Sequence, residues 1–307
     1  MKKLRFIVSL PTKDNDYQEE QARAAEQAAH RFGVEIEIVS ANNDAISQTQ
    51  QLLKIIQSPQ ESRPDAIIVE PAGGTALPQV ARAAASSAIG WVVVNRDADY
   101  LAEFRASYKV PCFSITSDHE EIGRIQGKQF AALLPAGGCV LYIQGPAESL
   151  AAKQRSAGMY ETKPAHVQIK VMKAQWTEES SFKAVSSWLR LSTSQQARID
   201  AIGAQDDSMA MGARRAFQEL TTGEAREHWL RLPFTGCDGV PKTGQAWVRN
   251  GQLAATIVIP PNTGLAIEKL VGFFQGGVLP PDRSLTPATS YPSIESLTKR
   301  KVRSHSA

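Results

Sequence analysis

Short β-rich runs alternate with helical patterns along almost the whole chain, and this alternation restricts the fold more than any other sequence feature. A helix between two strands supplies the long crossover connection that parallel pairing needs. Parallel sheets built in this way are covered by helices on both faces. The sequence therefore predicts an α/β fold with parallel sheets. The expected strands are Arg5–Leu10, Glu35–Val39, Ala66–Glu70, Trp91–Asn95, Cys112–Thr116, Cys139–Gln144, Val167–Met172, Ile199–Ala204, Phe234–Cys237 and Ala254–Ile259.

The stretch after the first expected strand shows the helical pattern most clearly. Tyr17, Ala25, Ala28 and Phe32 recur on one face of a helix, and Gly33 follows as a residue that ends helices. We therefore expect a helix from Tyr17 to Phe32.

The number of expected strands is large for one sheet, and 307 residues are enough for two domains with separate cores. The proline-rich stretches Ile259–Asn262 and Pro280–Pro292 are typical of further crossings between the domains. Several crossings predict a hinge rather than a loose linker. The expected domains are residues 1–116 with 260–288, and residues 117–259 with 289–307.

Composition and charge indicate which kinds of binding partner the protein can have. The chain is 42% hydrophobic and 21% charged, as soluble globular proteins are. The net charge of +3 comes from scattered basic residues, which gives no footprint for nucleic acid. The basic run Lys299–Arg303 is expected to be a solvated end.

The N-terminus resembles the opening of a signal peptide, but the apolar run that ends at Leu10 is short, and Pro11 and Lys13 follow it. Taken as written, the chain is expected to stay in the cytoplasm.

The sequence contains no recognised catalytic or metal-binding motif. Cys112, Cys139 and Cys237 lack the spacing of a zinc site or a disulfide framework, and the five histidines share no metal-binding spacing. We expect no catalytic residue, no metal and no cofactor. The cysteines are expected to be buried, and His119 to begin a helix.

Polar side chains gather just past the expected strand ends, where open α/β sheets bind ligands. Acids, guanidinium groups, amides and aromatic rings together suit a polyhydroxylated ligand, because planar groups bond adjacent hydroxyls and a ring covers an apolar face. The candidate ligand-binding residues are Asn15, Tyr17, Glu70, Asn95, Arg96, Arg155, Trp176, Asp206 and Asp238.

Structural roles compete with ligand binding at most of these positions. Asp206 and Asp207 fall at the start of a helix, where carboxylates are stabilised, and for Asp207 we favour a capping role. Asn95 to Asp97 would fit a turn with a surface ion pair, and Asp238 before a glycine would fit a turn. Isolated aromatic residues such as Trp176 are commonly buried in cores.

Several of these residues stand in motifs that occur together. These are Asn15-Asp16-Tyr17, Val94-Asn95-Arg96-Asp97, Ala151-Ala152-Lys153-Gln154-Arg155, Gln205-Asp206-Asp207-Ser208-Met209-Ala210-Met211-Gly212-Ala213 and Gly236-Cys237-Asp238-Gly239. In this combination the chain resembles the type I periplasmic sugar-binding proteins, the group of the ribose-binding protein. Their fold is shared with the effector domains of lac-repressor-type regulators. The resemblance implies two Rossmann-like domains joined by a multi-strand hinge and closing on a cleft, and a periplasmic location.

The resemblance also implies roles for individual residues. Tyr17 would stack on the sugar and Trp176 would close the pocket, while Arg96, Arg155, Asp206 and Asp238 would bond hydroxyls. Three departures affect the ligand: Glu70 stands where the family often has an amide, Asp206 where it has Asn, and Asn95 where it has Asp. Ile259 also replaces a Gln of the ribose binders. The pocket is therefore expected to be acidic, and a different sugar, a polyol or an amino-bearing ligand is implied.

The function expected from this resemblance is non-catalytic binding of a small sugar or polyol in an interdomain cleft. The chain would then be the substrate-binding component of an ABC-type sugar transporter, with a membrane permease as partner. One alternative is a stand-alone ligand sensor acting on a signalling partner, and a third, ranked last, is a sugar-acting enzyme. Nucleic acid is not an expected partner, because no helix-turn-helix precedes Phe6.

Overall fold

The computed structural model describes residues 3–73, 76–192 and 198–298, and in this part the chain forms two compact units. Unit 1 comprises Met1–Ser117 and Pro260–Thr286, and unit 2 comprises Asp118–Ile259 and Pro287–Ala307. The basic run at 299–303 lies outside the described residues.

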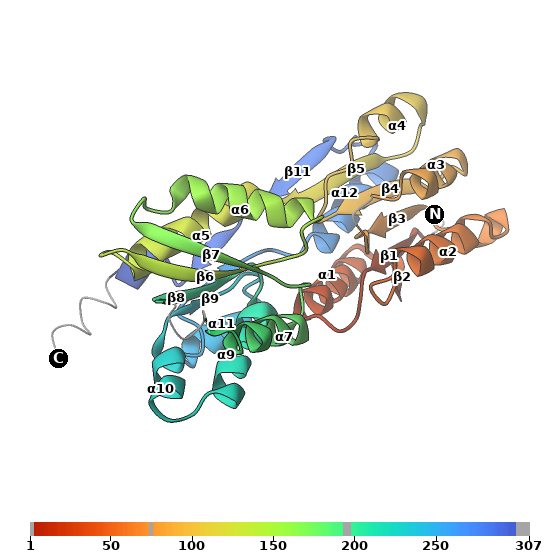
Figure 1. Ribbon diagram of the computed structural model, residues 1–307. Coiled ribbons are helices and arrows are strands. Elements are labelled where there is room, and N and C mark those ends of the chain that lie inside the picture. The colour runs from red at the N-terminus through yellow and green to blue at the C-terminus, as the bar shows by residue number, and fades with distance from the viewer. Residues whose placement is uncertain (1–2, 74–75, 193–197, 299–307) are drawn as a thin grey trace. The chain divides into compact units, whose positions relative to one another are not determined.

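Unit 1 is built on a six-stranded parallel sheet with the order β11-β5-β4-β3-β1-β2 (Figure 1). Helices α1 and α12 cover one face, where Phe6 and Val8 pack with Ala25 and Leu270. Helices α2, α3 and α4 cover the other face. The strands are β1 (Arg5–Leu10), β2 (Glu35–Ser40), β3 (Ala66–Val69), β4 (Gly90–Val94), β5 (Cys112–Ser117) and β11 (Arg283–Thr286). The helices are α1 (Asp16–Phe32), α2 (Ala45–Ile56), the 3₁₀ turn Gln60–Ser62, α3 (Pro78–Ser86), α4 (Leu101–Ser107) and α12 (Thr263–Gly276).

Unit 2 contains a four-stranded parallel sheet with the order β7-β6-β8-β9. One face packs against α5 and α6 through Phe130 and Met159, and the other packs against α7 and α9 through Val185 and Met209. The strands are β6 (Gly138–Gln144), β7 (Val167–Lys173), β8 (Ala201–Ala204), β9 (Phe234–Thr235), β10 (Thr256–Val258) and β12 (Thr289–Tyr291). The helices are α5 (His119–Leu133), α6 (Leu150–Thr162), α7 (Glu178–Leu189), α9 (Asp207–Leu220), α10 (Gly223–Arg231) and α11 (Gly244–Arg249).

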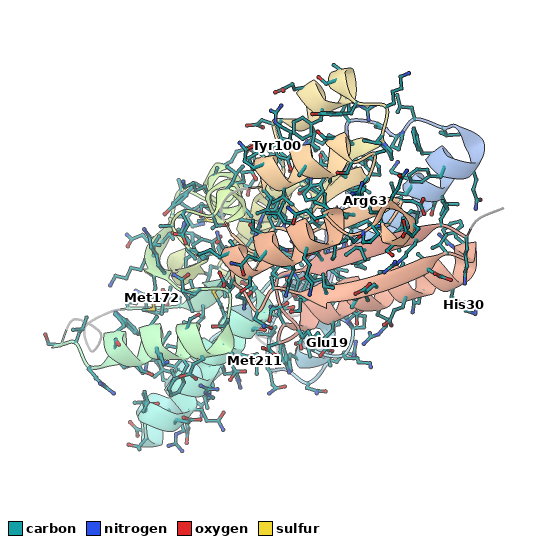
Figure 2. The ribbon with its side chains drawn as sticks, turned by 90° about the vertical axis from the view of Figure 1, so that its right-hand side faces the viewer. Glu19, His30, Arg63, Tyr100, Met172 and Met211 are labelled. Atoms are coloured by element: carbon teal, nitrogen blue, oxygen red, sulfur yellow. The ribbon has the colours of Figure 1, made fainter. Side chains whose placement is uncertain are left out.

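Helix α1 shows how local sequence sets the ends of an element. The Asn15 side chain accepts hydrogen bonds from the first amides of the helix, and Gly33 ends it at φ 65°, a left-handed conformation that glycine adopts without strain. Ala25 and Ala28 face the core, whereas Glu19 and His30 are exposed (Figure 2).

The α/β class with parallel sheets is confirmed, with one local correction at β10. The stretch 280–292, expected to be an extended crossing, contains strand β11 of unit 1 and strand β12 of unit 2. Strand β10 pairs with β12 in an antiparallel two-stranded sheet, and isolated parallel bridges join Thr235 to Ala255 and Asp238 to Val258.

The three cysteines are buried and free. Burial raises the pKa of the Cys112 thiol to about 11. No helix in the described ranges has the length and apolar character needed to cross a membrane.

Candidate functional site

In unit 1, two predicted site residues meet at the carboxyl ends of adjacent parallel strands. Glu70 follows β3 and Asn95 follows β4, and Asn95 Nδ2 donates a hydrogen bond to Glu70 Oε1 at 2.9 Å. Both residues are buried, and Asn95 Oδ1 has no hydrogen-bond partner among the described residues. A buried acceptor of this kind is a suitable contact for a ligand hydroxyl.

A buried glutamine fixes the backbone that carries Glu70. Gln48 in α2 donates from Nε2 to the carbonyl oxygen of Glu70 at 2.9 Å and to Ser9 Oγ at 3.0 Å. Its Oε1 accepts from the Ala72 amide at 2.8 Å. The loop after β3 is therefore held on both sides of Pro71.

The other predicted residues of unit 1 lie near the start of α1 and after β4. Asn15 Oδ1 accepts from the amides of Tyr17 and Gln18, so the side-chain oxygen of Asn15 serves the helix cap. Tyr17 is buried, and its hydroxyl donates to the carbonyl oxygen of Pro260 at 3.3 Å. Arg96 is half-buried.

A surface ion pair was considered within the turn from Asn95 to Asp97, but the ion pair that Asp97 forms is with a residue outside this turn. Asp97 pairs with Arg283 of β11, at 2.7 Å from Nε to Oδ1. That pair ties the segment after β4 to the edge strand.

In unit 2, the predicted site residue Arg155 contacts three other residues of the unit. It lies in α6 and is only 6% exposed. Its Nη1 donates to the carbonyl oxygen of Gln205, and its Nε donates to His119 Nδ1 at 3.4 Å. The guanidinium carbon lies 5.5 Å from the centre of the Trp176 ring, a cation–π arrangement.

The pKa of the buried Cys237 thiol depends on charged groups near the carboxyl ends of β8 and β9. Burial raises its pKa well above the usual value, Arg155 lowers it, and Asp238, Asp207 and Asp206 raise it. The Arg155 guanidinium bonds to the carbonyl oxygen of Gln205, the residue before Asp206, and the Asp207 amide bonds to the carbonyl oxygen of Cys237, the residue before Asp238. These contacts bring the chain segments of Arg155, Asp206 and Asp238 together within unit 2.

The two adjacent acids of this set have different roles. Asp206 is the N-cap of α9, and its Oδ1 accepts from the Met209 amide at 2.5 Å. Asp207, for which a capping role was favoured, instead accepts from the Gly239 amide at 2.8 Å and from Thr256 Oγ1 at 2.7 Å. Since the backbone of Asp206 is extended at φ −145°, its side chain and not that of Asp207 turns back onto the helix. Asp207 thus fastens the segment that carries Asp238.

Asp207→Ala is expected to lower the free energy of unfolding by about 2–5 kcal/mol, because it leaves two buried donors unsatisfied at about 1–3 kcal/mol each. Asp206→Asn keeps a capping oxygen, so its stability should change by less than about 1 kcal/mol. Urea denaturation of both variants measures this difference. Equal losses in the two variants would contradict the division of roles.

Three predicted site residues have a left-handed backbone. The φ angles are 57° at Asn95, 59° at Trp176 and 101° at Asp238. Such conformations are strained in non-glycine residues and concentrate at functional sites. A Cβ at Gly145 would overlap the indole of Trp176, so that glycine allows the ring to lie against the backbone after β6.

Two residues that hold Arg155 were not among the predicted site residues. Gln205 appeared only within a motif, and His119 only as the first residue of a helix. A polar residue at the end of an apolar strand and a histidine directly after a capping aspartate were the signals available. The described residues contain no group of three or more His, Cys, Asp or Glu that could hold a metal ion.

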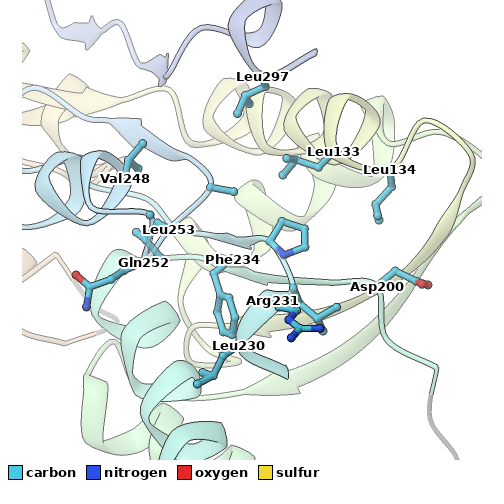
Figure 3. Close-up of a pocket in the computed structure, with 14 residues that line it drawn as sticks. Leu133, Leu134, Asp200, Leu230, Arg231, Phe234, Val248, Gln252, Leu253 and Leu297 are labelled. Carbon is cyan, nitrogen blue, oxygen red and sulfur yellow. The ribbon is translucent and has the colours of Figure 1, made fainter. Parts of the chain in front are cut away.

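A separate pocket of about 400 Å³ lies at the opposite, amino ends of the unit 2 strands (Figure 3). Most of the residues that line it are apolar, among them Leu230, Phe234 and Leu297. Its two charged residues bond elsewhere: Asp200 accepts from the Cys139 amide, and Arg231 pairs with Glu227. None of the predicted site residues lines this pocket.

Comparisons with known proteins agree with this architecture. The chain is 34% identical over 148 residues to the ribose import binding protein RbsB of Salmonella typhimurium. This alignment covers 48% of this chain and 47% of that protein. It is 29% identical over 230 residues to the xylitol-binding protein of Mycolicibacterium smegmatis, covering 72% and 58%. The aligned part of the chain thus spans about half the length of these curated relatives.

A solved structure matches the fold along nearly the whole chain. An ABC transporter periplasmic solute binding protein from Actinobacillus succinogenes with bound D-allose has a TM-score of 0.79 at 20% identity. The match covers 97% of this chain and 100% of that one. The family model described as "Periplasmic binding protein domain" matches residues 6–266. The resemblance to type I sugar-binding members is therefore confirmed, and the chain belongs to the periplasmic binding protein family.

Proposed function

We propose that this protein binds a small polyhydroxylated molecule, a sugar or polyol, and releases it unchanged. In this proposal it is the substrate-binding component of an ABC-type importer, and its protein partner is the membrane permease of that importer. Support comes from the family and from relatives named for ribose import and xylitol binding. No feature of the described residues favours the stand-alone sensor over the importer.

One observation carries the proposal: a buried guanidinium group lies beside a half-buried indole, and it is held by the carbonyl oxygen of Gln205, the residue before Asp206. Arg155 supplies planar donors that can bond adjacent hydroxyls, and Asp206 and Asp238 supply acceptors. The Trp176 ring offers an apolar face for the C–H side of a sugar. Unit 1 would add Glu70 and Asn95 as acceptors, with Arg96 and Tyr17 as further ligand contacts and Asn15 contributing its amide nitrogen.

The charges of the proposed site favour a neutral or amino-bearing ligand over an acidic one. Glu70, Asp206 and Asp238 are three carboxylates, whereas Arg96 and Arg155 are two guanidinium groups, so the set has one excess negative charge. A sugar acid would add a further negative charge and be repelled.

The same residues argue for binding without catalysis. A glycosidase needs a pair of carboxyl groups that act as acid and nucleophile or base. Here the oxygen Oδ1 of Asp206 is committed to the helix cap. The relatives compared above are likewise named for binding.

A thermal-shift screen tests the proposal. The panel should contain pentoses, hexoses, polyols, amino sugars, sugar acids, nucleotides and amino acids. We expect a rise in melting temperature with at least one neutral sugar, polyol or amino sugar, and a smaller or no rise with the matching sugar acid. Stabilisation by nucleotides or amino acids alone would refute the proposed ligand class.

A further inference from the structure

Gln205 is a fully buried residue whose side-chain amide bonds at both of its ends within unit 2. It follows β8, and its Oε1 accepts from the Gly145 amide, after β6, at 2.9 Å. Its Nε2 lies 3.0 Å from the Ala152 carbonyl oxygen and from Ser156 Oγ, both in α6. The side chain therefore joins the end of β8 to β6 and to the helix that carries Arg155.

The backbone of the same residue holds the guanidinium group directly. Arg155 Nη1 donates to the carbonyl oxygen of Gln205. Arg155 directly precedes Ser156, so the Gln205 amide fixes this turn of α6 while the Gln205 carbonyl oxygen fixes the direction of the guanidinium group. A guanidinium group held through one of its nitrogens keeps further N–H donors for another molecule.

The indole of Trp176 is linked to Gln205 through Gly145. The ring lies so close to this glycine that a Cβ there would overlap it. Since Gln205 Oε1 bonds to the Gly145 amide, it fixes the backbone against which the ring lies. The centre of the ring is also 5.5 Å from the guanidinium carbon of Arg155. One buried residue thus contacts the supports of both side chains.

A second set of buried hydrogen bonds holds the Gln205 amide itself. Gln205 Nε2 lies 3.0 Å from Tyr142 Oη, which donates to Gln126 Oε1 at 2.9 Å. Gln126 Nε2 in turn donates at 2.7 Å to the carbonyl oxygen of Ala204, the residue before Gln205. The network returns to the strand on which it began, so the amide cannot turn without breaking several buried hydrogen bonds.

We propose that Gln205 is a positioning residue that fixes Arg155 and Trp176 relative to each other for contact with one ligand. This inference rests on the proposed function. A sugar presents hydroxyls at the edge of its ring and C–H groups on its face, so it can bond to the guanidinium group and cover the indole together only when the two side chains keep a set geometry. Contacts of this kind lose affinity when the residues that support them are removed.

Two variants separate positioning from burial. Gln205→Met keeps an unbranched side chain of similar size but makes none of the amide hydrogen bonds. Gln126→Met is the matched control, because Gln126 is equally buried in unit 2 but its hydrogen bonds go to Tyr142 and Ala204. Both variants should lose stability, which urea denaturation measures.

Affinity is measured by calorimetric titration of each folded variant with D-ribose, xylitol and D-allose. We expect Gln205→Met to bind about 10-fold more weakly than wild type or worse, and Gln126→Met to stay within about threefold. Wild-type affinity in Gln205→Met, or equal losses in the two variants, would overturn the inference.

A milder substitution keeps the test decisive if Gln205→Met does not fold. Gln205→Glu preserves the size of the side chain and the acceptor for the Gly145 amide, but it places an oxygen against the Ala152 carbonyl oxygen. We expect this variant to bind about threefold more weakly or worse. Unchanged affinity in Gln205→Glu would equally overturn the inference.

A further measurement needs no ligand. The indole N–H resonance of Trp176, assigned by its loss in Trp176→Phe, should shift by more than its linewidth in Gln205→Met and keep its wild-type position in Gln126→Met. If the signal shifts in this way while no sugar or polyol binds to wild type, the proposed function fails and the positioning role stands. If sugars bind and neither the signal nor the affinity responds to Gln205→Met, only the inference fails.

Discussion

An Arg155→Met variant is expected to bind its sugar or polyol about 10- to 100-fold more weakly than wild type, since a hydrogen bond from a charged group contributes about 1.5–3 kcal/mol. Methionine keeps an unbranched apolar chain, so the packing of α6 against α5 should survive. Calorimetric titration gives the affinity, and urea denaturation gives the stability.

The matched control for this prediction is Arg124→Met. Arg124 also lies where α5 meets α6, but it pairs with Glu120, Glu121 and Glu161 at the surface. Its loss should leave affinity within about twofold, since exposed ion pairs contribute little. If Arg155→Met bound as tightly as wild type and only its stability changed, Arg155 would be a structural residue.

Gly158→Ala is expected to lower the free energy of unfolding by about 3 kcal/mol or more, because the two helices that carry His119 and Arg155 touch through glycines. A Cβ at Gly158 would overlap the carbonyl oxygen of Glu120 and lie 2.9 Å from the Arg124 amide nitrogen. The obstacle is backbone, which cannot rotate away as a side chain can. Forcing α5 and α6 apart should also lengthen the contact between His119 and Arg155 and weaken ligand binding.

Gly272→Ala in α12 provides the comparison. It too is a glycine inside a helix, but a Cβ at this position would meet no atom of the described residues within 4 Å. Alanine there should leave stability equal or higher by up to about 1 kcal/mol, since glycine costs backbone entropy in a helix. Chemical denaturation of both variants tests the pair, and equal stability changes would contradict the close packing of α5 on α6.

The elements with strong local signals could be predicted from the sequence. Strand β1 has the predicted bounds Arg5–Leu10, and α1 ends at Gly33, because apolar periodicity and a helix-ending glycine are local properties. Strand β12 could not be predicted in this way. Its three residues pair with β10, more than thirty positions earlier, and that pairing depends on how the chain returns to unit 2.

The candidate site also has some features that local sequence predicts and others that depend on tertiary contacts. Residue types at strand ends predicted Glu70 and Asn95 as candidates, because the carboxyl ends of parallel strands are where an α/β sheet presents side chains, and the structure places both residues directly after β3 and β4. The separate roles of Asp206 and Asp207 depend on one backbone angle and on Thr256 in a distant strand, which no local pattern contains. The contact of His119 with Arg155 likewise depends on helix packing.

The central claim is that this protein binds a neutral polyhydroxylated ligand and leaves it intact. It is tested most directly by calorimetric titration of refolded, ligand-free protein with D-ribose, xylitol, D-allose and myo-inositol, followed by NMR identification of the recovered compound. We predict one-to-one binding of at least one compound, with a dissociation constant on the order of micromolar, about −8 kcal/mol, and recovery of the compound unchanged. No binding of any of the four, or conversion of a bound compound into a product, would contradict the account.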